Sequence, residues 1–93
     1  MTKPQYSLEA RANIAGINAY IKARNPAAAV AVIARIRLTV RSLAMFPRMG
    51  HPGIVRNTYE ITVRGLPYVI VYELKRKGRD ILILGVFHGA RDR

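Results

Sequence analysis

Five ionisable side chains could together cleave a phosphodiester, a reaction that needs a general base, a general acid and a cation to hold the phosphate. They are Glu60, Glu73, Arg64, His88 and Arg91. Carboxylates and imidazoles can exchange protons, and a guanidinium binds anions strongly. Whether these groups form one site depends on the strands that carry them.

The second half of the chain has the pattern of an antiparallel meander. Tyr68 to Leu74 and Ile81 to Phe87 are rich in β-branched and aromatic residues, and a charged, glycine-containing loop separates them. Such a pair of runs predicts a β-hairpin. Thr58 to Val63 alternates and predicts a preceding strand, with Arg64-Gly65 as a tight reversal.

A register follows if Val63 pairs with Leu66 and Leu74 pairs with Ile81. Opposite residues share a face, and faces alternate along each strand. One face then carries Tyr59, Ile61, Val63, Tyr68, Ile70, Tyr72, Ile81, Ile83 and Phe87. The other carries Glu60, Thr62, Arg64, Val69, Val71, Glu73, Leu82, Leu84, Val86 and His88. The first face is bulky enough to receive helices, and the second has an apolar centre with a charged rim.

This register separates the possible acid and base. His88 lies opposite Pro67, at the far end of the strand from Glu73. At ~3.3 Å per residue the separation is on the order of 20 Å, too far for a shared proton, and Glu60 lies two strands away. We therefore predict no catalytic residue, and a histidine at a strand end is often purely structural. The basic residues left together, predicted to contact an anionic target, are Arg64, His88 and Arg91.

Two helices precede the meander. Leu8 to Arg24 repeats apolar residues at spacings of three and four, after Ser7 as a helix N-cap. Asn25-Pro26 breaks the pattern, and a second helix runs from Pro26 to about Met45. So short a connection predicts an antiparallel helical hairpin.

The remaining segments complete the predicted fold. Residues 5–7 suggest a brief strand, and the proline- and glycine-rich residues 46–53 suggest a loop between the helices and the sheet. We predict one domain, residues 1–93, of the α+β class. Its N-terminal helical hairpin packs on one face of a small antiparallel sheet, in the order β-α-α-β-β-β.

The composition excludes several kinds of chemistry. The chain has no cysteine and two histidines, which exclude disulfides and argue against a zinc site. It shows no glycine-rich phosphate loop. We therefore expect no metal and no cofactor. No apolar run approaches the ~20 residues that span a bilayer, and no signal peptide is visible, so we expect a cytoplasmic protein without a membrane partner.

The charge indicates an acidic partner. Sixteen lysine and arginine residues against five acidic ones give a net charge of +11. Nucleic acid and an acidic protein both fit, and a merely soluble basic surface is the alternative. Two helices can cover only one face of the sheet, so the second face also suggests a partner site, unless a terminal segment folds over it.

Four short motifs, in this order and spacing, resemble a known family. They are Ser7-Leu8-Glu9-Ala10, Pro47-Arg48-Met49-Gly50, Pro67 to Tyr72 and Val86 to Asp92. Together with the predicted element order, they resemble the RelE/ParE toxins of bacterial type II toxin–antitoxin pairs. The resemblance covers nearly the whole chain.

This family divides by activity. RelE-like members are ribosome-dependent mRNA endonucleases, and ParE-like members poison DNA gyrase. The ribonuclease branch commonly has an arginine where this chain has Val69, and a tyrosine in the C-terminal tail, which is absent from His88 to Arg93. The His-Gly-Ala-Arg-Asp ending is more similar to the ParE branch. The resemblance therefore implies a gyrase inhibitor; the alternatives are a ribonuclease acting on the ribosome with mRNA, or a non-toxic basic binding module.

The resemblance also implies the partner. Antitoxins of this family are typically acidic and wrap the toxin with a helix and an extended segment. The helix would lie on the apolar sheet face, with basic residues of the toxin meeting acidic ones. The predicted antitoxin-binding residues are Val69, Val71, Leu82, Leu84 and Val86.

Overall fold

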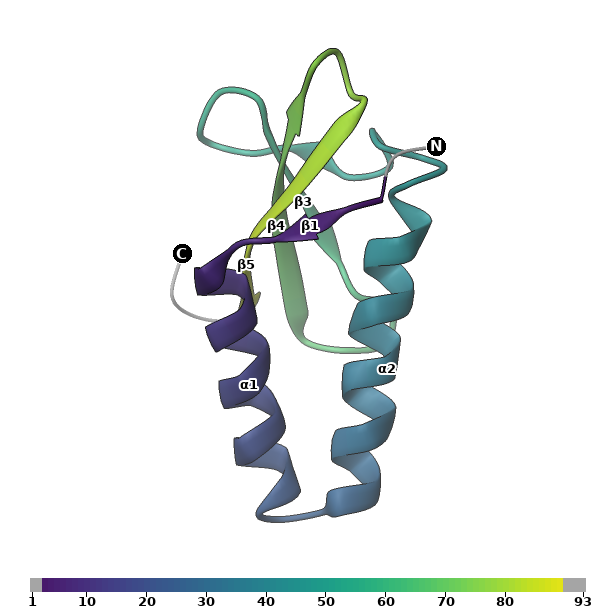
Figure 1. The fold of residues 1–93 in the computed structure, drawn as a ribbon. Coiled ribbons are helices and arrows are strands. Elements are labelled where there is room, and N and C mark those ends of the chain that lie inside the picture. Colours follow the sequence, from purple (N-terminus) through teal and green to yellow (C-terminus); the bar gives the residue numbers. More distant parts are fainter. Residues whose placement is uncertain (1–2, 90–93) are drawn as a thin grey trace.

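The computed structural model describes residues 3–89, which form two helices packed on one face of a five-stranded sheet (Figure 1). The elements are β1 (Gln5–Tyr6), α1 (Leu8–Lys22), α2 (Pro26–Ser42), β2 (His51–Pro52), β3 (Thr58–Thr62), β4 (Tyr68–Lys75) and β5 (Asp80–His88). The strand order is β1-β5-β4-β3-β2, and only β1 with β5 is parallel. The predicted α+β class is confirmed. The parallel pairing of β1 is new, and so is the two-residue β2, which lies in the segment expected to be a loop.

Both helices begin where the sequence predicts, because each has a side chain that caps it. Ser7 Oγ accepts the backbone N–H of Ala10 at 3.0 Å, and Asn25 Oδ1 accepts that of Ala28 at 3.1 Å. Each bond satisfies one of the N–H groups that a helix start leaves unpaired. Both helices end two or three residues earlier than predicted, at Lys22 and Ser42 in the structure.

The core lies between the helical hairpin and the sheet. Ile36 of α2, Ile70 of β4 and Ile83 of β5 are fully buried. Burying a side chain of this size stabilises the fold by about 1.5–3 kcal/mol. The other members of the core are Ala10, Ile14, Val40, Leu43, Val63, Tyr72, Leu74, Ile81 and Val86. Both helices lie on the same side of the sheet, so neither covers its opposite face (Figure 1).

The register of the β3–β4 hairpin differs from the predicted one, because the connecting loop is longer than expected. Thr62 pairs with Val69. Val63 therefore lies opposite Tyr68, and the Val63 N–H donates to the Tyr68 carbonyl at 2.9 Å. The predicted partner of Val63, Leu66, lies in the turn instead. This register differs from the predicted one by two residues, an even shift that keeps every side chain on its face.

The β4–β5 hairpin contains a β-bulge that was not predicted. Near the turn the predicted register is correct, but it shifts between Val71 and Tyr72, which pair with Gly85 and Ile83. Leu84 is therefore an extra residue on β5. Because the pleat alternates, the side chains of β5 beyond Leu84 point to the face opposite the predicted one.

Three positions change face as a result. Val86 points toward the helices and is 2% exposed, so its predicted place on the uncovered face is wrong. His88 pairs with Tyr68 rather than with Pro67, so it lies on the same helix-covered side of the sheet as Tyr68. Phe87 was predicted to lie toward the helices, but it turns to the uncovered side, opposite Val69.

Candidate functional site

The sheet surface away from the helices, here called the open sheet face, carries a band of apolar side chains. The band consists of Val69, Val71, Leu82, Leu84 and Phe87. Val69 is 7% exposed, and the other four are half-buried. No helix of residues 3–89 lies over the band. An apolar surface of this kind left beside water commonly marks a partner site.

A loop at residues 53–57 borders the band, and the two together line an open hollow of about 260 Å³. Ile54 and Val55 line the hollow, although they are 93% and 66% exposed overall. The base of the loop is fixed, because the Gly53 N–H donates to the Thr58 carbonyl at 2.8 Å. The hollow has mostly apolar walls and is open to solvent, so it can receive an apolar side chain of a partner.

Sequence reasoning missed part of this site. Ile54 and Val55 were not predicted as part of it, because the proline- and glycine-rich pattern that indicates a loop ends at residue 53. Their signal was an isolated apolar pair between Gly53 and a polar stretch. Phe87 was missed because the bulge was not foreseen.

Charged groups of both signs surround the band. Glu60 is 7% exposed and lies across the sheet from His51 on one side and Val71 on the other. Lys75 Nζ lies 3.8 Å from Glu73 Oε1, a partly exposed pair that contributes little to stability. The rim of the open sheet face is therefore mixed rather than uniformly basic.

The predicted target-contact residues do not share the open sheet face. His88 packs edge-on against Tyr68, with 5.8 Å between ring centroids, and lines a groove beside α1 on the helix-covered side. Arg64 lies in the exposed β3–β4 turn, where its carbonyl accepts a hydrogen bond from Arg35 Nη1 at 2.8 Å. Arg91 lies outside the described residues. The predicted placement of His88 beside Arg64 on one face is wrong because the bulge reverses the end of β5.

The sheet also separates the candidate acids and bases. Glu60 and Glu73 belong to the open sheet face, whereas His88 lies on the other side. Within residues 3–89, no group of histidine and acidic side chains could hold a metal ion. No helix in that range is long and apolar enough to cross a bilayer.

Two solved toxin structures share this arrangement of helices and strands. A chain of the chromosomal ParDE TA system from P. aeruginosa superposes with a TM-score of 0.81 at 21% identity, over 95% of this chain and 96% of that one. The isolated E. coli RelE toxin superposes with a TM-score of 0.72 at 13% identity, over 99% and 88%. The fold is therefore that of the RelE and ParE toxins.

The amino-acid sequence places the chain within that class. Residues 5–93 match the family described as the ParE toxin of the type II toxin-antitoxin system, parDE. "Putative toxin Y4kP" of Sinorhizobium fredii (strain NBRC 101917 / NGR234) is 38% identical over 84 residues, which are 90% of this chain and 84% of Y4kP. The chain belongs to the ParE toxin family of type II toxin–antitoxin systems, as its motifs indicated.

Proposed function

We propose that this toxin inhibits DNA gyrase and is neutralised by an acidic antitoxin that docks on the open sheet face. The choice of gyrase rests on membership of the ParE family, whose resemblance implies that target. The antitoxin is inferred from the family and from the net charge of +11. Its docking site is inferred from the uncovered apolar band.

The surroundings of Val69 support gyrase over RNA cleavage. This residue occupies the strand position where the ribonuclease branch commonly has an arginine. It is 7% exposed and pairs with Thr62 and Phe87. An apolar side chain among such neighbours can neither hold a phosphate nor stabilise a developing anion. The sheet also lies between His88 and the two glutamates of the open sheet face, so these groups do not form an acid–base pair.

The open sheet face supports helix-in-groove binding by the antitoxin. An amphipathic helix presents apolar anchors at intervals of three and four residues. The band on β4 and β5 and the neighbouring hollow beside the loop at residues 53–57 offer places for such anchors. Acidic residues that flank the apolar anchors, and those of the extended segment, would meet basic residues of the toxin, which speeds association and favours the correct partner. The proposed contacts are Val69, Val71, Leu82, Leu84 and Phe87; Val86 is omitted because it lies in the core.

A supercoiling assay tests the proposed target. Purified toxin is added to DNA gyrase and relaxed plasmid, and we expect supercoiling to stop and cleaved DNA to accumulate. The cognate antitoxin should restore supercoiling. In parallel, mRNA on translating ribosomes should stay intact. Unaffected gyrase at micromolar toxin would contradict the proposal, and mRNA cut in the ribosomal A site would favour the ribonuclease alternative.

A further inference from the structure

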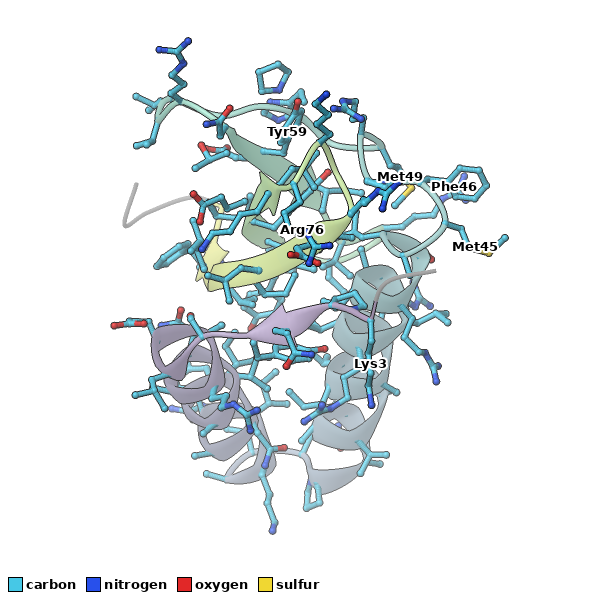
Figure 2. All side chains as sticks on the ribbon, turned by 45° about the horizontal axis from the view of Figure 1, so that its top comes forward. Lys3, Met45, Phe46, Met49, Tyr59 and Arg76 are labelled. Atoms are coloured by element: carbon cyan, nitrogen blue, oxygen red, sulfur yellow. The ribbon has the colours of Figure 1, made fainter. Side chains whose placement is uncertain are left out.

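A second surface of the toxin exposes large apolar side chains that do not belong to the hydrophobic core. Met45, Phe46 and Met49 lie between α2 and β2 and are 64%, 60% and 44% exposed. Figure 2 shows them gathered at one edge of the molecule. Exposed methionine and phenylalanine side chains in one cluster are typical of protein-binding surfaces, since methionine adapts to varied partners.

The cluster is held in place rather than loose. The Tyr72 hydroxyl donates to the Pro47 carbonyl at 2.8 Å and accepts the Gly50 N–H at 3.1 Å. The Met49 N–H donates to the Phe46 carbonyl at 3.0 Å. A fixed segment loses little conformational entropy when a partner binds, so the exposed cluster is preorganised for docking. Because Tyr72 points to the helix-covered side, the segment that it anchors lies away from the open sheet face.

The β4–β5 turn brings basic side chains to the same end of the molecule. An added Cβ atom at Gly78 would lie 3.2 Å from Arg48 Nη1, which places the Arg48 guanidinium against the turn. The turn also carries Lys75, Arg76, Lys77 and Arg79. Only Lys75 and Arg76 form ion pairs, with Glu73 and Asp80. Among the described residues, the other three basic side chains have no acidic partner.

Two of these basic residues occupy backbone positions that suit other amino acids. Arg76 and Lys77 have φ of 52° and 58°, and the Gly78 N–H donates to the Lys75 carbonyl at 3.1 Å. Successive positive φ values are those of a type I′ turn, for which Asn-Gly is preferred. Arg76 has an exposed ion pair with Asp80, whereas Lys77 forms no ion pair within residues 3–89. Backbone strain at Lys77 without such compensation points to a function of its side chain.

We propose that this end of the toxin is the surface that docks on its target, through an acidic patch of the target protein that also offers an apolar recess. The surface, here called the basic–apolar end, comprises Met45, Phe46, Arg48, Met49 and residues 76–79. A nucleic acid would pair with the cations but would leave the apolar cluster unmatched, whereas an acidic protein surface satisfies both. The inference rests on the proposed function, in which the antitoxin occupies the open sheet face and leaves this end for gyrase.

A turn variant tests the basic half without weakening the fold. Arg76→Asn with Lys77→Gly inserts the residues that a type I′ turn prefers, so the melting temperature should rise by a few degrees. The toxin concentration that half-inhibits gyrase should rise about tenfold, since charge complementarity is lost. The control variant, Lys22→Gln with Arg24→Gln, removes two charges at the helical hairpin tip and should inhibit gyrase like the wild type.

Phe46→Ser tests the apolar half. It should also weaken gyrase inhibition about tenfold, because exposed aromatic anchors often dominate an interface. Both variants should bind the cognate antitoxin as the wild type does. Undiminished gyrase inhibition, or equally weakened binding of the antitoxin, would overturn the proposal. The proposal would also be overturned if the wild type and the Phe46→Ser variant bound a 20-bp DNA duplex and the turn variant did not, because the basic side chains would then recognise nucleic acid. If wild-type toxin leaves gyrase unaffected, the proposed function is wrong, but the docking surface can still be tested by growth arrest of cells that express the toxin. In that assay, variants that arrest growth as strongly as the wild type would overturn the docking surface.

Discussion

Asn13 accepts the backbone N–H of Val86 at 3.0 Å through its Oδ1 atom, and so joins α1 to β5 just beyond the bulge. The bond is partly buried, and α1 packs along this part of β5 (Figure 1). A helix side chain therefore satisfies a strand N–H that β1, which pairs only with Leu82 and Ile83, does not reach.

Removing this bond should destabilise the toxin. We expect Asn13→Ala to lower the free energy of unfolding by about 1–2 kcal/mol, because the Val86 N–H loses its partner in a partly buried place. Urea unfolding followed by circular dichroism measures the change. Asn18→Ala is the control, since Asn18 is half-buried on the same helix and its side chain forms no hydrogen bond within residues 3–89; its cost should stay within about 0.5 kcal/mol. Equal losses from both variants would contradict a specific role for Asn13.

The bulge predicts opposite outcomes for two neighbouring residues. Val86→Ala should cost about 1–3 kcal/mol of stability, because it leaves a cavity in the core. Its effect on antitoxin affinity, measured with the folded protein, should be small. Phe87→Ala should instead weaken binding of the acidic partner by about 1–3 kcal/mol, because it removes an aromatic anchor from the open sheet face. A reversed pattern would mean that β5 has no bulge in solution.

The sequence could not reveal the bulge, and the reason is the composition of β5. Residues 81–87 are apolar apart from Gly85, so the strand shows no alternation from which a face could be assigned. The predicted faces of β3 and β4 were right, because the register error in the β3–β4 hairpin was two residues, and an even shift leaves each side chain on its face. Gly85 was the only local signal, since an isolated glycine within a strand often marks a bulge.

The candidate sites were predictable to different degrees. The open sheet face could be predicted, because two helices can cover only one side of a sheet. Four of its five predicted residues, including Val71 and Leu84, lie there. The basic–apolar end could not be predicted, because it joins two connections that are far apart in the sequence. Nothing in Lys75 to Arg79 specifies a turn with two positive-φ basic residues.

Alkaline pH should destabilise the toxin through two tyrosines. Burial raises the pKa of Tyr72, and it also raises the pKa of Tyr6, although Arg37 beside Tyr6 opposes the effect. In the unfolded chain a tyrosine loses its proton near pH 10. Above that pH the unfolded state binds fewer protons than the folded state, so stability falls as pH rises through the folded pKa.

The Tyr72→Phe variant tests this dependence. It should be less stable at neutral pH, by about 1–3 kcal/mol, because the Pro47 carbonyl and the Gly50 N–H lose their shared partner. Above pH 10 its stability should fall less steeply than that of the wild type. Urea unfolding at intervals between pH 7 and about 11 measures both effects. Parallel curves for the two proteins would show that Tyr72 does not contribute to alkaline unfolding.

A charge placed in the centre of the open sheet face should block the antitoxin. Leu84 is half-buried at the bulge and lines the hollow beside the loop at residues 53–57. Leu84→Glu would bury an unpaired carboxylate beneath a partner that is itself acidic, so affinity should fall by several kcal/mol. The toxin alone should remain folded, since the new side chain can reach water when no partner is bound. Leu38→Glu is the matched control: Leu38 is 52% exposed on α2, and the same charge there should leave the affinity nearly unchanged. Isothermal titration with the cognate antitoxin measures both, and equal affinity for Leu84→Glu and wild type would place the antitoxin elsewhere.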